Sequence, residues 1–302
     1  MRNGPNTRSL IFTLFGDYIR HSGNEIWIGS LIRLMKEFGH NDQSVRTAVS
    51  RMYKQGWLVS SKIGNRSYYR LTDRGMARME EAGKRIFKLK PDQWDGNWRM
   101  LFYSIPEEKR SIRDDLKKEL SWSGFAPLSG SCWITPNNLT EETKQLIKKY
   151  QLEKYVDFFT ADYEGPKQNI RLVQSCWNLT DISNKYKQFI DEYTKKFNMT
   201  RRKCEQKSIT NAQCFVEKTM LVHEYRKFLF IDPGLPAELL PEDWIGYDAA
   251  QLFSVYYKLL APPAITFYEN VFKEGNTSKE TSRSYDLYEQ PLLIAEDEPP
   301  SK

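Results

Sequence analysis

The sequence predicts an α+β fold, and three observations support this prediction. Residues 1–90 combine helix-period hydrophobic patterns with a short hairpin, residues 91–165 alternate strand and helix signals, and residues 166–272 repeat aromatic residues at helical spacing. A chain of 302 residues, of which 40% are hydrophobic, is long enough to build two or three domains with cores. Residues 273–302 are rich in Ser, Thr, Glu and Pro, and we expect them to form a disordered tail.

The N-terminal part begins with two predicted helices. The first covers residues 7–20 and buries one apolar side, which consists of Leu10, Ile11, Leu14, Phe15, Tyr18 and Ile19. A shorter amphipathic helix around residues 31–35 follows, and the tight turn 39–42 joins it to a third helix.

The third predicted helix, residues 43–54, is amphipathic. Its apolar residues have the i, i+3, i+4, i+7 spacing that places side chains on one helix face: Val45, Ala48, Val49 and Met52. Asn41 or Asp42 can cap its start, and Gly56 suits its end. The other face is short, polar and basic, as expected of a helix that enters the major groove of DNA. The predicted DNA-contacting residues of this helix are Gln43, Ser44, Arg46, Thr47, Ser50, Arg51 and Lys54.

A β-hairpin is predicted directly after this helix. Two strand-like runs, residues 57–59 and 68–71, flank a loop in which Gly64-Asn65 has the composition of a two-residue turn. Lys62 and Arg66 lie beside this turn, where we expect them to reach phosphate or an adjacent minor groove. Helices and hairpin together predict a winged helix-turn-helix over residues 1–90, and hence sequence-specific DNA binding.

The net charge of +6 is unevenly distributed along the chain. Residues 1–90 hold 17 Lys and Arg against 7 Asp and Glu, residues 91–232 hold 23 against 20, and residues 233–302 hold 5 against 12. A positive N-terminal domain favours a polyanionic partner there. Two alternatives stay open, namely a basic helix face that is merely solvated and a winged helix that docks proteins.

The middle domain, residues 91–165, has the strand-helix order βαββαβ, which predicts a ferredoxin-like sandwich. The predicted elements cover residues 98–105, 107–122, 125–128, 132–135, 140–150 and 155–161. Two helices on one face of an antiparallel sheet leave the other face open, and this face must be covered. We expect Trp133 and Phe159 to help bury it against a second copy, which makes the domain a candidate dimerisation module. Cover by the C-terminal domain is an equal alternative.

Residues 166–272 are predicted to be mostly helical. One helix is lined by aromatic and aliphatic residues at helical spacing, namely Tyr186, Phe189, Ile190, Tyr193 and Phe197. Further helices are expected over residues 209–225 and 247–260. Within the tail, residues 291–294 form a hydrophobic patch that can dock locally.

Composition argues against several classes of protein. Four cysteines, at positions 132, 176, 204 and 214, form no Cys-x-x-Cys pair, and only three histidines accompany them, so a structural zinc site is not expected. No cofactor is expected either. No leader opens the chain and no apolar run approaches the roughly 20 residues that span a bilayer. We therefore expect a cytoplasmic protein with reduced thiols. No Ser-His-Asp order, phosphate-binding glycine loop or HExxH motif is found, so a binding protein is expected rather than an enzyme.

Two stretches carry a more distinctive pattern. The first is residues 43–52 with Gly56-Trp57-Leu58 after it, and the second is residues 223–228 followed by the proline-spaced run 232–246, which ends in Asp-Trp-Ile-Gly. These stretches resemble the phenylacetic-acid degradation operon repressors, the PaaX-type family of bacterial transcription regulators, and the domain order fits over roughly residues 5–270. The resemblance implies a homodimeric repressor of phenylacetate catabolic genes that leaves its double-stranded operator DNA when an aromatic acyl-CoA, phenylacetyl-CoA, binds.

The middle domain also resembles the small ferredoxin-like nucleases of bacterial adaptive immunity, which hold metal through an acidic residue near the end of the first strand. Here that strand ends in Tyr103-Ser104-Ile105, without a carboxylate. A metal-dependent nuclease is therefore an alternative function rather than the leading one.

An acyl-CoA effector presents phosphates and a phenyl ring, so its pocket needs Arg or Lys beside an aromatic slot. The candidate effector-binding residues are Tyr225, Arg226, Lys227 and Trp244. In the alternative reading, Arg226 pairs with Asp232 or Glu224 while Trp244 packs in the core.

Overall fold

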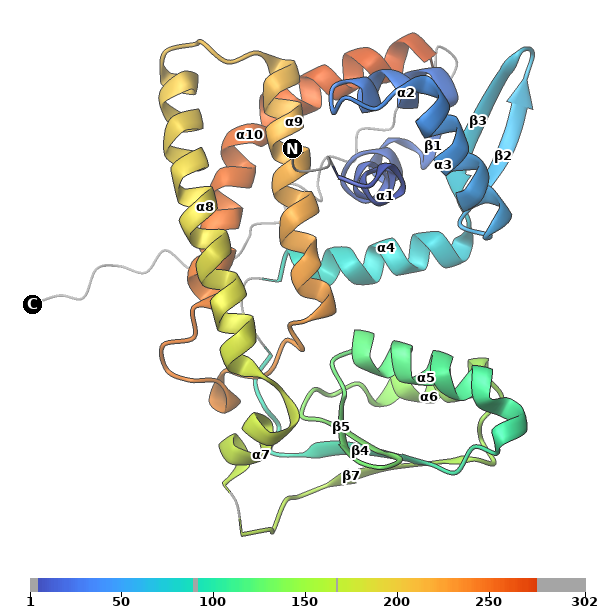
Figure 1. The fold of residues 1–302 in the computed structure, drawn as a ribbon, viewed down its shortest axis with the longest axis vertical. Coiled ribbons are helices and arrows are strands. Elements are labelled where there is room, and N and C mark those ends of the chain that lie inside the picture. The colour runs from blue at the N-terminus through green and yellow to red at the C-terminus, as the bar shows by residue number, and fades with distance from the viewer. Residues whose placement is uncertain (1–4, 89–91, 167, 276–302) are drawn as a thin grey trace, which may run out of the picture. The chain divides into compact units, whose positions relative to one another are not determined.

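The structure is a computed structural model that describes residues 5–88, 92–166 and 168–275. It is mixed α+β and mostly helical, with two small antiparallel sheets and a helical C-terminal region (Figure 1). The described residues form two compact units. The first comprises residues 5–88, 191–226 and 250–275, and the second comprises residues 92–166, 168–190 and 227–249.

The first unit opens with a small sheet among four helices. These elements are α1 (Thr7–Asp17), β1 (Glu25–Trp27), α2 (Ile28–Lys36), α3 (Asp42–Lys54), β2 (Leu58–Ile63), β3 (Arg66–Leu71) and α4 (Asp73–Ile86). The sheet has the order β1-β3-β2, and both pairings are antiparallel. Two residues connect β2 to β3, and Gly64 adopts a positive φ of 56°, which glycine tolerates and which a tight turn needs. The hairpin projects beside α3 (Figure 1).

The core of these elements is the one that helical spacing predicts. The apolar stripe of α3 is buried, as is the predicted side of the first helix. The buried residues are Leu10, Ile11, Leu14, Phe15, Tyr18 and Ile19 at the start of the chain, and Val45, Ala48, Val49 and Met52 on α3. Burial of one complete stripe fixes which face of α3 points outward.

Longer helices complete the first unit. They are the part of α8 (Leu179–Glu205) from residue 191 on, α9 (Asn211–Tyr225), and the part of α10 (Gly246–Gly275) from residue 250 on. Thr210 caps α9 in a reciprocal capping box with Gln213. A buried ion pair joins α1 to α9, because Lys218 Nζ lies 2.7 Å from Asp17 Oδ2. The Tyr257 hydroxyl of α10 donates to the other oxygen of Asp17 at 2.9 Å.

The second unit contains a four-stranded sheet with the predicted βαββαβ element order. Its elements are β4 (Trp98–Tyr103), α5 (Arg110–Trp122), β5 (Ala126–Ser129), β6 (Cys132–Thr135), α6 (Thr140–Lys149) and β7 (Val156–Ala161). The strand order is β5-β6-β4-β7, and all pairings are antiparallel. Helices α5 and α6 lie on the same side of this sheet (Figure 1). The unit also includes α7 (Asn169–Cys176), the first part of α8, and residues 227–249. Helix α7 lies in the range that was predicted to be mostly helical, although it was not predicted as a separate helix.

The two faces of this sheet differ, and one expectation about them is wrong. Trp133 pairs with Leu101 in register and lies in the core under the helices, at 6% exposure, so it does not belong to the open face. Phe159 pairs with Met100 on the other face and is 51% exposed. Side chains alternate along a strand, so the register decides the face, and the sequence did not specify that register.

The hydrophobic patch at 291–294 and the tail from residue 276 on lie outside the described residues. Among the helices that are described, none combines the length and the apolar composition needed to cross a membrane.

Candidate nucleic-acid interface

Helix α3 has a fixed start and a fixed end. Asn41 is the cap: its Oδ1 accepts the backbone N–H of Ser44 at 2.8 Å, and the Ser44 hydroxyl donates to the Asn41 carbonyl at 2.8 Å. Asp42 is instead the first helical residue. Its negative charge interacts favourably with the positive end of the helix dipole, and its carboxylate forms an ion pair with Lys36. Gly56 follows the helix with φ of 72°, as expected of a residue that ends a helix.

The outward face of α3 is polar and basic. Gln43, Ser50 and the three cations Arg46, Arg51 and Lys54 are exposed, whereas Ser44 and Thr47 are half-buried. Within the described part of the chain, none of the three cations forms an ion pair. The face therefore presents positive charge that is not neutralised locally, together with short groups that can donate and accept hydrogen bonds.

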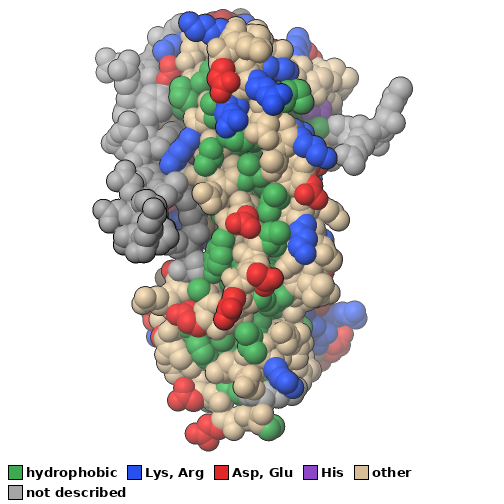
Figure 2. Space-filling view, turned by 90° about the vertical axis from the view of Figure 1, so that its left-hand side faces the viewer, with side chains coloured by type: hydrophobic (Ala, Val, Ile, Leu, Met, Phe, Trp, Pro, Cys, Tyr) green, Lys and Arg blue, Asp and Glu red, His purple; other side chains and the backbone are tan. Residues whose placement is uncertain are grey.

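The surface on the side of α8 differs from the outward face of α3 in its mixture of charges. Figure 2 looks onto the side of α8 and shows acidic, basic and hydrophobic side chains interspersed. On α3, by contrast, the one acidic residue is Asp42 at its first turn. A surface of a single sign is what a polyanion requires, and the outward face of α3 provides it.

The hairpin presents two kinds of residue at its tip. Lys62 is exposed at the end of β2. Arg66, the predicted partner of phosphate, is engaged within the protein: its Nη1 donates to the Gly275 carbonyl at 3.1 Å, and its guanidinium lies 4.8 Å from the centre of the Trp27 ring. Register places Lys62 and Arg66 on opposite faces of the hairpin, because Ile63 pairs with Arg66 and Lys62 pairs with Ser67.

Two exposed apolar residues beside this surface were missing from the sequence prediction. Tyr53 on α3 is 51% exposed, and Ile63 at the hairpin tip is 56% exposed. Tyr53 falls outside the i, i+3, i+4, i+7 stripe of α3, so the spacing itself could have identified it. Ile63 could have been found from its place next to a two-residue turn, where no core is within reach.

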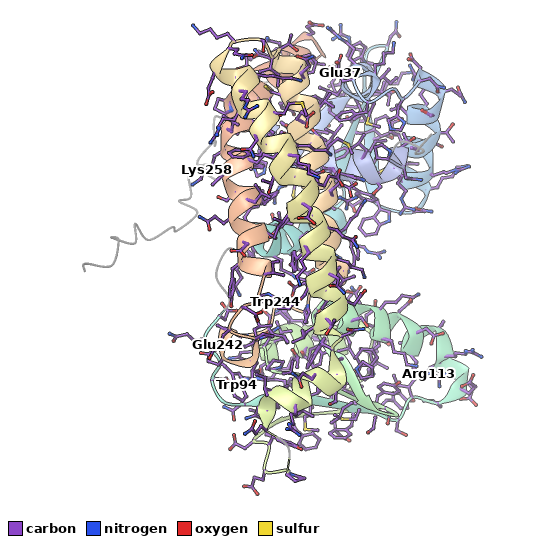
Figure 3. All side chains as sticks on the ribbon, turned by 60° about the vertical axis from the view of Figure 1, so that its left-hand side comes forward. Glu37, Trp94, Arg113, Glu242, Trp244 and Lys258 are labelled. Atoms are coloured by element: carbon purple, nitrogen blue, oxygen red, sulfur yellow. The ribbon has the colours of Figure 1, made fainter. Side chains whose placement is uncertain are left out.

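The candidate effector residues are divided between the two units. In the first unit, Tyr225 stacks on Phe253 with ring centres 4.1 Å apart, and Arg226 donates to the Ser9 carbonyl at 2.9 Å. In the second unit, Lys227 is exposed, and Trp244 is buried with its ring 6.1 Å from that of Tyr186 (Figure 3). Burial lowers the pKa of Arg226. Trp244 packs in a core, as the alternative reading expected, and the hydrogen-bond partner seen for Arg226 is Ser9.

The groups that could support metal chemistry are few in the part of the chain that the structure describes. Among the described residues, no three His, Cys, Asp or Glu side chains lie together in a way that could hold a metal ion. Strand β4 ends at Tyr103, and the next residue is Ser104, whose N–H donates to the Tyr155 carbonyl. The four cysteines are free thiols. Burial raises the pKa of Cys214 to about 11, so this thiol is not a reactive thiolate near neutral pH.

Comparison with known proteins identifies the family. Three family models match successive parts of the chain: PaaX-like protein over residues 6–75, PaaX protein central Cas2-like domain over 91–173, and PaaX-like protein C-terminal domain over 177–270. The transcriptional repressor PaaX of Escherichia coli strain K12 is 34% identical over 273 residues, which are 89% of this chain and 84% of that protein. The chain belongs to the PaaX family. The resemblance predicted from the sequence is thereby confirmed.

A solved structure is similar to this PaaX-family chain. Uncharacterized protein Rv0674 from Mycobacterium tuberculosis is 26% identical, with a TM-score of 0.51. The match covers 80% of this chain and 89% of that one. The likeness to a solved structure therefore extends over most of both chains.

Proposed function

We propose that this PaaX-family protein is a DNA-binding repressor of genes for phenylacetate catabolism, acting in the cytoplasm. The observation that carries the proposal is the outward face of α3, where Arg46, Arg51 and Lys54 are exposed and lack ion-pair partners among the described residues. A relative that is 34% identical bears the name transcriptional repressor PaaX. The basic face supports a polyanionic partner, and the relative supports a regulatory role for that binding.

In this proposal α1, α2 and α3 with the β2-β3 hairpin form a winged helix-turn-helix, and α3 enters the major groove. Because four residues of α3 are buried and Asn41 caps its start, the helix is held in one orientation before DNA arrives. A preorganised helix loses little entropy on binding. The residues proposed to meet base edges or phosphates are Gln43, Ser44, Arg46, Thr47, Ser50, Arg51, Lys54 and, on the wing, Lys62.

The proposal includes a homodimer and an effector. A symmetric dimer places two recognition helices in successive major grooves of a partly palindromic operator. An aromatic acyl-CoA, phenylacetyl-CoA in the leading version, releases the dimer by preferring a conformation in which the two helices are spaced differently. Tyr225, Arg226, Lys227 and Trp244 remain the residues proposed to respond to it. The family resemblance supports this effector, and the second candidate function, a metal-dependent nuclease, has no specific observation in its favour.

The proposal is tested on the DNA upstream of the protein's own gene. Hydroxyl-radical footprinting should give two protected patches about one helical turn apart. Phenylacetyl-CoA should remove the protection, whereas free phenylacetate should not. Absence of any discrete footprint at moderate salt would refute DNA-specific binding, and release by free phenylacetate would refute the thioester as effector.

A single substitution tests the face of α3. Arg51→Ala should weaken operator binding by about 1–3 kcal/mol, as expected for the loss of a base or close phosphate contact. The matched control is Lys258→Ala, which removes a positive charge from an exposed position of α10 (Figure 3). Operator affinity should be unchanged in the control. Equal affinity of a folded Arg51→Ala protein and the wild type would contradict the assignment of this face.

A further inference from the structure

The carboxyl end of α10 packs against the elements proposed to bind DNA. All of these segments belong to the first unit, and α10 ends beside α2 near the hairpin (Figure 1). The last four carbonyls of a helix have no partner within the helix and must find donors elsewhere. Among these carbonyls at the end of α10, that of Gly275 takes its donors from β3, and α2 donates to the carbonyl of Val271 just before them.

Hydrogen bonds to the carbonyls of Val271 and Gly275 come from two elements. The Ser30 hydroxyl of α2 donates to the Val271 carbonyl at 3.0 Å. On β3, the Tyr68 hydroxyl donates to the Gly275 carbonyl at 3.0 Å, and Arg66 Nη1 donates to the same oxygen at 3.1 Å. A cation at a helix carboxyl end is also favoured by the helix dipole.

Further contacts strengthen the same junction. Arg33 of α2 forms an ion pair with Glu274. Gly275 is buried against Trp27, and a Cβ added there would lie 2.8 Å from Trp27 Cε3 and closer still to the Ser30 hydroxyl. Real Cβ atoms do not approach that closely, so a methyl group at Gly275 requires the side chains of Trp27 and Ser30, or the helix end itself, to shift.

We propose that the last turn of α10, residues 271–275, is a clamp that holds the wing in the orientation it needs to contact DNA. Arg66 and Tyr68 are wing-positioning residues in this view, not nucleic-acid contacts. The inference rests on the proposed function and deepens it. It gives the two faces of the hairpin different roles. Arg66 and Tyr68 share the face that contacts α10, whereas Lys62 lies on the opposite face, which is proposed to contact DNA.

The clamp also couples the C-terminal part of the chain directly to the part proposed to bind DNA. The family model for the N-terminal domain matches residues 6–75, which include the wing, whereas the C-terminal model matches residues 177–270, which include most of α10. The hydrogen bond from Arg66 to Gly275 joins residues 209 positions apart. A change in the C-terminal region that draws α10 away from Trp27 therefore frees the wing without touching α3.

The test uses Gly275→Ala in the full chain, with Lys273→Ala as the matched control on the exposed side of the same turn. Wing protection in a hydroxyl-radical footprint should be lost in Gly275→Ala, while the protection due to α3 stays. The slope of log affinity against log salt should fall by about one, as expected for the loss of a single phosphate contact. Lys273→Ala should match the wild type in both respects.

Tyr68→Phe provides a gentler second variant, because it removes a donor to Gly275 and keeps the ring. Hydrogen exchange at the backbone amides of residues 58–71, measured without DNA, should be faster in both Gly275→Ala and Tyr68→Phe. Exchange as slow as in the wild type in both variants would overturn the clamp. If the wild type gives no footprint, the proposed DNA binding fails, and the exchange experiment still decides whether the clamp holds the hairpin.

Discussion

Lys218 is a completely buried cation, and its surroundings explain how the fold tolerates it. Its ammonium lies 4.2 Å from the ring centres of both Tyr18 and Tyr257 and forms an ion pair with Asp17. Burial lowers the pKa of Lys218, and the nearby Asp17 carboxylate opposes that shift. The two aromatic faces and the carboxylate together replace the water that the ammonium loses.

A double-mutant cycle tests this arrangement. Lys218→Met should destabilise the protein by about 3–5 kcal/mol, because it leaves the buried Asp17 carboxylate without its counter-charge. Adding Asp17→Asn should recover most of the loss, since a neutral amide still accepts the hydrogen bond from Tyr257. Urea unfolding of the two single variants and the double variant gives the coupling energy. A Lys218→Met protein as stable as the wild type would show that the ion pair has no net role.

The lowered pKa of His21 leads to a prediction of how the stability of the fold depends on pH. Burial, followed by the charge of Arg20, lowers the pKa of His21 from 6.5 to about 4. The unfolded chain therefore binds a proton between these values that the folded chain does not, so stability falls as pH decreases from 6.5 toward 4. Melting temperatures measured at pH 7, 6 and 5 should decrease, and His21→Gln should reduce the decrease. An identical pH profile for the variant would exclude His21 as the cause.

At the scale of elements, local patterns in the sequence predicted most of the helices and strands. The spacing of Val45, Ala48, Val49 and Met52 defined the buried face of α3, and its predicted span of 43–54 differs from Asp42–Lys54 by one residue. Such patterns depend on neighbours a few positions apart, which a single sequence contains.

Features that depend on distant partners were not predictable in this way. The face occupied by Trp133 depends on its register with Leu101, and the role of Arg66 depends on Gly275, which is 209 residues away. Arg66 also shows why the candidate site could be predicted only in part. A positive charge beside a hairpin turn indicates a phosphate contact, but the carbonyls at the end of a helix are an equally good partner for a guanidinium. The polar and basic character of the outward face of α3 could be predicted, except for Tyr53, because composition and helical spacing are both local.

At the scale of the whole molecule, the exposed part of the sheet in the second unit is a candidate surface for dimerisation. The face opposite α5 and α6 is divided. Cys132 and Ile134 on β6 are buried, and α7 packs against the neighbouring β5. Phe102 and Phe159 on β4 and β7 are 37% and 51% exposed, and their rings contact each other edge to face at 5.8 Å. Because β7 is also an edge strand, this half of the face is where a second copy would gain most by packing.

The proposed homodimer therefore predicts a specific effect of charge at this position. Phe159→Asp should convert the dimer to a monomer in light scattering coupled to size-exclusion chromatography, because a carboxylate buried between two apolar faces has no counter-charge. Met199→Asp is the matched control, since Met199 is a similarly exposed apolar residue on α8 in the first unit. Loss of the dimer should also abolish the paired footprint while single half-site binding persists weakly, because each α3 is unchanged. A dimer that survives Phe159→Asp and dissociates with Met199→Asp would move the interface from the sheet to the helical region.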